Sequence, residues 1–264
     1  MKSLRGQRSW WLLSLPLLAF LLIPLIALFT RVEPAILIQQ LRSEQAVQAI
    51  QLSLRTTVIS TLLAIVFGTG LAQLLARRDL RFRGPLDTLV ELPTVMPPSV
   101  AGIALLVAFG RRGLIGSSLE GLGIHIAFTE VAVILAQLFV AAPFYIKAAA
   151  IGFGGIDIEI QEAATIDGAS RGQMFRLVTL PLARSALVSG ATLTWARALG
   201  EFGATIIFAG NLPGRTQTMP LAIYLGFELD LGVALALSAI LIGLSLLALL
   251  LVKGPLNRAA DARS

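Results

Sequence analysis

The sequence predicts an all-helical protein that crosses a membrane six times. Of its 264 residues, 56% are hydrophobic and 14% are charged, whereas soluble domains carry about 25% charged residues. The mean hydropathy is +0.83. Apolar stretches long enough to cross about 30 Å of hydrocarbon recur along the chain, and they lack the alternating pattern of a β-barrel. Helices are therefore expected, because a helix satisfies its own backbone hydrogen bonds in lipid.

Six apolar stretches are assigned as membrane spans. They lie at residues 10–30, 53–76, 93–110, 131–153, 182–210 and 231–252. The first follows a basic N-terminus, as a secretory signal does. It is longer than a signal segment and no A-x-A cleavage site follows, so we expect it to be retained. The third contains Pro97 and Pro98, which remove backbone donors and predict a bend or hinge.

The basic residues predict the orientation of the chain in the membrane. With six spans both termini lie on one side, and fourteen of the 21 Lys and Arg residues fall on that side. These are Lys2, Arg5, Arg8, Arg77, Arg78, Arg81, Arg83, Lys147, Arg171, Arg176, Arg184, Lys253, Arg258 and Arg263. Because basic loops stay in the cytoplasm, both termini are predicted to be cytoplasmic. The net charge of +6 then reflects topology, and no nucleic-acid partner is expected.

The segments predicted to lie outside carry few chemical signals. Residues 31–52 have helical spacing and are expected to lie along the outer surface. Residues 211–230 begin with a Pro213–Gly214 turn and are expected to form a short helix after Pro220. Cysteine is absent and His125 is the one histidine, so we predict neither a disulfide framework nor a metal site. No residue is assigned a catalytic role.

A polar insert at residues 154–181 interrupts the apolar pattern on the cytoplasmic side. Asp157 is expected to cap a first short helix, and residues 167–168 to end it. Ser170 and Gln173 have capping-box spacing and predict the start of a second helix. The pair Leu180–Pro181 is expected to end the insert. A helix, turn and helix with an almost bare alanine and glycine surface is predicted, and such a surface suits a protein partner.

The insert resembles the EAA motif of the permeases of bacterial ATP-binding-cassette importers. The matching residues are Glu162, Ala163, Ala164, Gly168, Val178, Leu180 and Pro181, with Val178 where the family usually has isoleucine. The resemblance implies the type I importer fold, with a coupling helix that docks on a cytoplasmic ATPase. It thereby implies an ATPase-coupling role for Glu162, Ala163, Ala164, Asp167, Gly168, Leu180 and Pro181.

The resemblance also implies partners. The chain contains no G-x-x-x-x-G-K-[ST] phosphate-binding motif, so ATP and Mg are expected on separate ATPase subunits and this chain is not expected to be an enzyme. The family assembles two permease copies, here expected to be a homodimer, with two ATPases and an external binding protein. We expect residues 1–264 to form one permease domain in the lipid bilayer, with its core at 53–252.

Residues 195–224 resemble the molybdate branch of this family and, less closely, the sulfate branch. The shared part is Gly200, Glu201, Phe202 and Gly203, followed by an AGNLP turn. Residues 92–106 and 110–128 also resemble the molybdate branch. The resemblance implies import of molybdate, and of tungstate as a similar tetrahedral dianion, with a periplasmic or extracytoplasmic molybdate-binding protein as partner.

Arg197 and Glu201 are four residues apart in an apolar stretch, and charged residues at membrane depth usually face a bundle interior or a watery path. Two interpretations stay open. In one, the two side chains pair along the helix and fix its packing. In the other, Arg197, Gly200, Glu201 and Thr205 line the translocation path, although a threonine in such a helix often bonds its own backbone.

Three alternatives have other consequences. A sulfate or thiosulfate permease has the same architecture and differs in the anion that its binding protein holds. A membrane-embedded enzyme would use Glu201 with His125 or Glu130, but those two residues are predicted at the outer rim. A passive channel would need no coupling helix.

Overall fold

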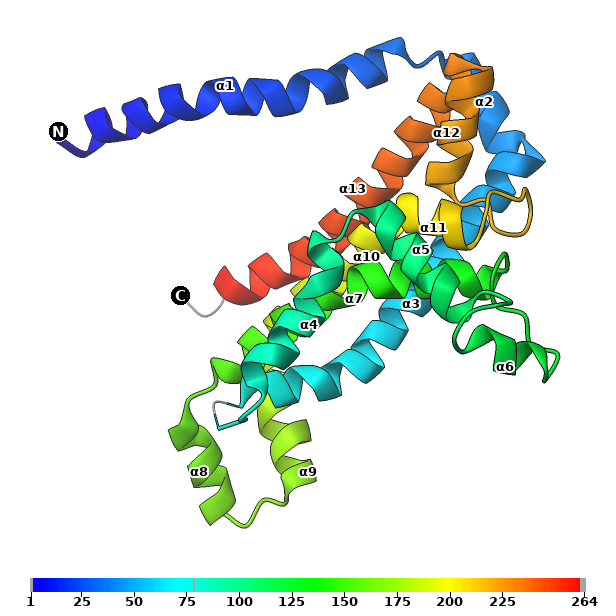
Figure 1. Ribbon diagram of the computed structural model, residues 1–264. Coiled ribbons are helices and arrows are strands. Elements are labelled where there is room, and N and C mark those ends of the chain that lie inside the picture. Colours follow the sequence, from blue (N-terminus) through cyan, green and yellow to red (C-terminus); the bar gives the residue numbers. More distant parts are fainter. Residues whose placement is uncertain (1, 78, 262–264) are drawn as a thin grey trace.

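The computed structural model describes residues 2–77 and 79–261, and of residues 2–12, 248 and 251–261 only the backbone. Within these residues every regular element is helical (Figure 1), which confirms the predicted fold class. The elements are α1 Lys2–Arg31, α2 Pro34–Arg42, α3 Glu44–Ala76, α4 Arg83–Val95, α5 Pro98–Phe109, α6 Gly116–Glu120, α7 Glu130–Gly154, α8 Ile158–Ile166, α9 Arg171–Gln173, the π-helix η1 Met174–Thr179, α10 Leu180–Leu199, α11 Gly203–Phe208, α12 Met219–Leu229 and α13 Leu231–Asp261.

Several helices are long and apolar enough to cross a membrane. In the described part of the chain there are four, at Leu13–Arg31, Glu44–Ala76, Glu130–Gly154 and Arg171–Leu199. The pair α4 and α5 makes a fifth if its two bent halves are counted together. The apolar part of α13 at Leu231–Leu247 is shorter. The prediction of a multi-pass membrane protein is confirmed, and the number of six spans stays a prediction.

The core of the bundle is formed by α3, α7 and α10, which pack closely because small residues face neighbouring helices. A Cβ added at Gly68 of α3 would lie 3.0 Å from Ile146 of α7. A Cβ added at Gly190 of α10 would lie 2.7 Å from the Cβ of Ala148, also on α7. Such close approach replaces the hydrophobic driving force that is missing between helices in lipid. By contrast, α1 runs away from the bundle, and its apolar window has no buried residue (Figure 1).

The helix α3 begins earlier than the sequence predicted. The Ser43 side chain accepts a hydrogen bond from the Ala46 backbone N–H at 3.3 Å, and Glu44 occupies the first turn. This N-cap starts the helix at Glu44. Residues 44–52 therefore belong to α3 and bury Ala46, so the expected surface segment 31–52 is wrong for its second half. The predicted helix after Pro220 is confirmed as α12.

The third predicted span, 93–110, is two helices at an angle of 113°. The helix α4 starts at Arg83, inside what was expected to be a loop, and ends at Val95. Met96 is extended, as the residue before a proline prefers to be, and α5 starts at Pro98. The bend predicted from Pro97 and Pro98 is confirmed, but a helix running unbroken through 93–110 is not.

The fifth predicted span, 182–210, differs at both ends. It breaks after Leu199 and resumes as α11 at Gly203. At the other end, α9, η1 and α10 follow one another without a break from Arg171 to Leu199. Pro181 was expected to end the insert, yet it occupies the first turn of α10 directly after the π-helical turn. A π-turn relaxes the hydrogen-bond ladder where proline lacks its N–H, and the chain stays helical.

The contact between α5 and α11 is tight enough to test directly. A Cβ added at Gly203 would lie 2.5 Å from the Cβ of Pro98, with backbone behind it. We expect Gly203→Ala to destabilise the protein by about 1–3 kcal/mol through overpacking. Gly70→Ala is the matched control, because an added Cβ there meets no atom within 4 Å. Thermal unfolding in detergent should show a lower Tm for Gly203→Ala alone; equal Tm values would mean that this contact can relax.

Candidate functional site

The polar insert presents α8 as an exposed helix that contacts η1. None of the nine residues of α8, all of which the structure describes, is buried. Glu162 and Ala163 are exposed and Ala164 is half-buried. Ile158 and Ile166 are 69% and 85% exposed. Exposed apolar side chains on a helix with so few contacts leave a surface to which a partner could bind.

The turn after α8 depends on a glycine and on a capping box. Gly168 has a φ of +83°, a conformation that side chains rarely adopt, and nothing lies near the position of its missing Cβ. The Ser170 backbone N–H donates to Gln173 Oε1 at 2.9 Å, and the Gln173 N–H donates to Ser170 Oγ at 3.3 Å. The predicted capping box is confirmed. Asp157 occupies the N-cap position of α8, but its side chain makes no capping bond.

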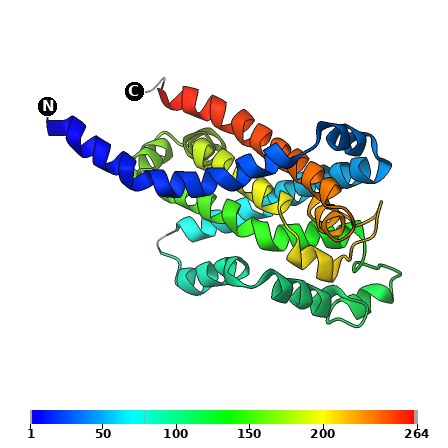
Figure 2. The ribbon, with the colours of Figure 1, turned by 90° about the horizontal axis from the view of Figure 1, so that it is seen from above.

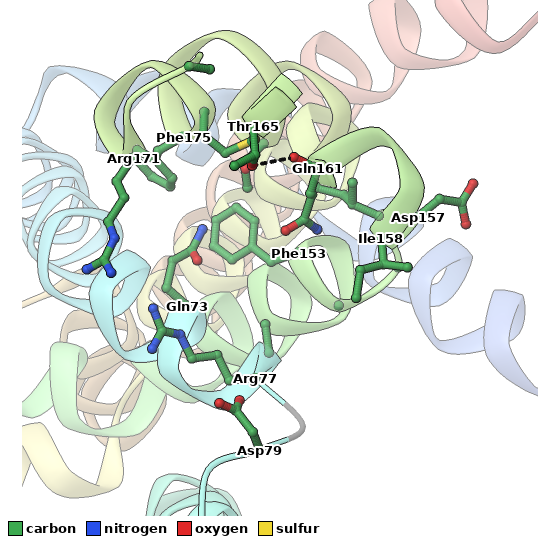
Figure 3. Close-up of a pocket in the computed structure, with 17 residues that line it drawn as sticks. Gln73, Arg77, Asp79, Phe153, Asp157, Ile158, Gln161, Thr165, Arg171 and Phe175 are labelled. Atoms are coloured by element: carbon green, nitrogen blue, oxygen red, sulfur yellow. Dashed lines mark hydrogen bonds between the residues drawn. The ribbon is translucent and has the colours of Figure 1, made fainter. Parts of the chain in front are cut away.

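A cavity of about 1050 Å³ separates α8 from the helical bundle (Figure 3). Its walls are α8, the α9–η1 segment, the end of α3 and the end of α7, with the residues that follow α3 and α7. The polar side chains at this cavity are Gln73, Arg77, Asp79, Asp157, Gln161, Thr165, Arg171 and Thr179. Phe175 of η1 meets Phe153 of α7 edge to face, with ring centroids 6.2 Å apart. The helix α8 is thus connected to the bundle by its contact with η1 and by residues 155–157, which join it to α7.

At the other end of the same continuous helix, Arg197 and Glu201 form an ion pair. Arg197 Nη1 lies 2.8 Å from Glu201 Oε2. The second carboxylate oxygen, Oε1, accepts the backbone N–H of Ala204 at 2.9 Å. Glu201 thus bridges the break between α10 and α11, because it holds the last turn of one helix and the first turn of the next. The helix α11 has six residues, and one of its free N–H groups is satisfied in this way.

The two partners of this ion pair differ in exposure. The Glu201 side chain is 1% exposed and the Arg197 side chain is 32% exposed. The carboxylate is therefore inside the chain, while the guanidinium reaches its surface and keeps donors that Glu201 does not use. A charged group at membrane depth faces water or protein rather than lipid. The exposed part of Arg197 is therefore open to contact with water, an anion or another subunit.

Gly200 and Thr205, the other two residues predicted for the path, differ in their exposure. Gly200 lies in the break and is exposed. Thr205 is fully buried, and its Oγ1 has no hydrogen-bond partner among the described residues. It therefore lies away from the surface of the chain and does not bond its own backbone as expected. The structure brings Arg197, Gly200 and Glu201 together at the break, with Thr205 behind them.

Sequence reasoning missed a second charged cluster. Lys147 of α7 pairs with Asp87 and Glu91 of α4 at 2.8 Å and 2.6 Å. The sequence carried a signal, because Asp87 and Glu91 are four residues apart on a helix and Lys147 interrupts an apolar run. The signal was missed because both acidic residues fall between the predicted spans 53–76 and 93–110, where no helix was expected. At the opposite end, Glu130 pairs with Arg55 of α3, and His125 lies 4.0 Å from Glu120.

The chain matches known proteins over most of its length. Residues 64–254 match the model of the family described as binding-protein-dependent transport system inner membrane component. The molybdenum transport system permease protein ModB of Mycobacterium tuberculosis is 43% identical over 235 residues, which is 88% of each chain. The probable sulfate transport system permease protein cysT of Chlorokybus atmophyticus is 36% identical over 84% of this chain and 79% of its own.

The fold has a counterpart among solved structures. A chain in the crystal structure of a bacterial alginate ABC transporter in complex with an alginate pentasaccharide-bound periplasmic protein superposes with a TM-score of 0.76. The similarity covers 98% of this chain and 97% of that chain, at 19% sequence identity. At this identity the similarity concerns the fold alone.

Proposed function

Because the chain belongs to the family of binding-protein-dependent transport system inner membrane components, we propose that it is the membrane-spanning permease subunit of an ATP-driven importer for molybdate. The observation that carries the proposal is the similarity to the mycobacterial molybdenum permease along nearly the whole of both chains. Tungstate is proposed as a second substrate, since it forms a tetrahedral dianion of similar size. The protein is multi-pass, and both termini are proposed to be cytoplasmic.

The partners follow from the family and from the unpartnered surface of the polar insert. We propose that α8 docks on a separate ATPase, with Glu162, Ala163 and Ala164 at the contact. Asp167 and Gly168 would set the turn beyond it, while Leu180 and Pro181 join the insert to α10. ATP and Mg would be held by two such ATPases. A second copy of the permease and an extracytoplasmic molybdate-binding protein complete the proposed assembly.

The translocation path is proposed to run along the surface that Arg197 reaches. A guanidinium lowers the electrostatic barrier for a dianion, and a neighbouring carboxylate prevents tight retention, which a transport path requires. The buried position of Glu201 supports this division of roles, because the anion would meet Arg197 and Gly200 before Glu201. Thr205 is proposed as a supporting residue behind the path.

Substrate choice can be tested with the complete transporter in liposomes, including its ATPase and its binding protein. We expect ATP-dependent uptake of radiolabelled molybdate that excess tungstate suppresses and excess sulfate leaves unchanged. The sulfate alternative is favoured by the 36% identical sulfate permease and predicts the reverse competition. Calorimetry on the isolated binding protein provides a second measurement, and tight sulfate binding without preference for molybdate would contradict the proposed substrate.

A further inference from the structure

The broken helix pair α4 and α5 is attached to two different parts of the bundle. On one side of the break, α5 is in close contact with α11: an added Cβ at Gly102 would lie 2.8 Å from the Cβ of Ile207, and one at Gly203 would lie 2.5 Å from that of Pro98. On the other side, α4 packs mainly on α7. Figure 2 shows α4 and α5 along one edge of the bundle. Movement of α4 relative to α5 is therefore resisted by the attachment of α4 to α7.

That attachment is polar as well as apolar, because Val90 and the half-buried Leu86 pack into the core cluster while charged residues flank them. Of the thirteen residues of α4, all of which the structure describes, Val90 alone is buried. Asp87 precedes Val90 by one turn and Glu91 is the next residue, and their Oδ1 and Oε1 atoms lie 2.8 Å and 2.6 Å from Lys147 Nζ. One cation on α7 thus holds two carboxylates on α4. It can release either of them and still be paired with the other.

A cavity lies beside this cluster. It measures about 320 Å³, and its lining includes Arg83 and Asp87 of α4 and Lys147 of α7. Close-packed interfaces resist displacement, whereas the start of α4 faces empty space toward the end of α3. Ala76, Gly154 and Gly155 line both this cavity and the larger one behind α8. The cluster therefore lies near residues 154–155, where the polar insert begins.

The exposure of the three side chains is informative about their role. Lys147, Asp87 and Glu91 are 32%, 40% and 51% exposed. Ion pairs with this much exposure contribute little to the stability of a fold. They do select one orientation of a helix over another when the helix has few apolar contacts. A cluster of this kind suits a contact that is broken and remade.

We propose that Lys147 is a positioning residue, and that with Asp87 and Glu91 it forms a latch that holds α4 against α7. The joint at Met96–Pro97 lets α4 swing, while α5 stays with α11. This inference rests on the proposed function, because the latch lies next to the segment on which the ATPase would act. Release of the latch lets α4 move away from α7 during the transport cycle and opens the space between them.

The absence of cysteine from the sequence allows a direct test. Ala150 is half-buried and lines the cavity between α4 and α7, so Ala150→Cys reports the access of water to this space. The rate of its modification by a water-soluble maleimide is measured in the complete transporter, without nucleotide and with ATP trapped by vanadate. In the otherwise unaltered chain we expect the rate to differ between the two conditions.

In the Ala150→Cys background, Lys147→Met should raise the nucleotide-free rate about two- to fivefold, the change expected when partly exposed pairs are lost. It should also reduce the difference between the two nucleotide conditions, a change that a purely structural pair would not cause. Asp87→Asn with Glu91→Gln should have the same effect. Glu91→Lys with Lys147→Glu should restore the original rate, because a cross-helix pair forms again in the opposite sense.

Arg184→Met is the matched control. It removes an exposed cation from α10 without affecting α4, and it should leave the rate of Ala150→Cys unchanged. Equal rates in the Lys147→Met, Arg184→Met and unaltered chains would overturn the latch, as would failure of the charge exchange to restore the rate. Molybdate uptake, measured in parallel, separates the two proposals. A transporter that responds to ATP at Ala150→Cys but does not import molybdate contradicts the proposed substrate and leaves the latch standing.

Discussion

Deletion of residues 159–169 is expected to reduce ATP-driven uptake to background while the protein still inserts into the membrane. The reason is geometric. The deleted residues comprise most of α8 and the turn after it. None of the residues of α8 is buried, and a cavity of about 1050 Å³ lies between α8 and the bundle. The bundle therefore loses little on deletion, whereas the ATPase loses its proposed contact. Uptake into liposomes and protease resistance of the purified chain measure the two effects.

A point substitution gives a milder version of the same experiment. Gly168→Val forces a β-branched residue into a positive φ, which strains the local backbone, while its added Cβ meets no other residue. We expect reduced uptake and reduced binding of the ATPase. Gly172→Val is the control, since Gly172 is equally open but lacks the unusual backbone angle.

Undiminished uptake in the variant that lacks residues 159–169 would refute the coupling role of the insert.

The local features of this insert could be predicted from the sequence because they depend on neighbouring residues. The capping box of Ser170 and Gln173 and the turn at Gly168 are both found as expected. The continuity of the helix past Pro181 could not be predicted in this way. It depends on the π-turn at Met174–Thr179, and proline by itself predicts a helix boundary. Composition and periodicity carry no signal for a π-turn.

The break at Gly200 was missed for a related reason. Hydropathy continues through residues 182–210, and hydropathy was the basis of the prediction of one span. The break is stabilised by contacts between distant residues, such as that of Gly203 with Pro98, and by the hydrogen bond from the Ala204 N–H to Glu201. The pairing of Arg197 with Glu201 was predictable, because it needs only their spacing of four residues. For the cluster of Lys147 the spacing of Asp87 and Glu91 was a signal, but their pairing with Lys147 depends on the packing of α4 against α7, which spacing does not give.

The continuity of the helix from Arg171 to Leu199 changes the expected transmission of movement. A loop that ended at Pro181 would act on α10 through a flexible joint. A helix that extends into the insert moves with it, and its far end carries Arg197. We therefore expect that displacement of α8 by an ATPase moves the continuous helix Arg171–Leu199, and with it the Arg197–Glu201 pair. The break at Gly200 then limits how far that movement extends into α11.

Replacement of Arg197 by glutamine is expected to be the most damaging single substitution in the chain. It leaves the Glu201 carboxylate, 1% exposed, without its cation, and an unpaired buried charge costs about 3–5 kcal/mol. Glu201→Gln should be better tolerated, because the amide oxygen can still accept the Ala204 N–H. Thermal unfolding of the two variants in detergent measures this difference.

The double variant Arg197→Gln with Glu201→Gln separates the two roles of the pair. Both charges are gone, so most of the lost stability should return, as it does when a buried pair is replaced as a unit. If the pair serves packing alone, uptake returns with stability. If Arg197 lowers the barrier for the anion, the double variant folds but imports molybdate far more slowly, with ATPase docking intact. We expect the second result, because the guanidinium reaches the surface of the chain while its partner is buried. A stable double variant with normal uptake would instead assign the pair to packing.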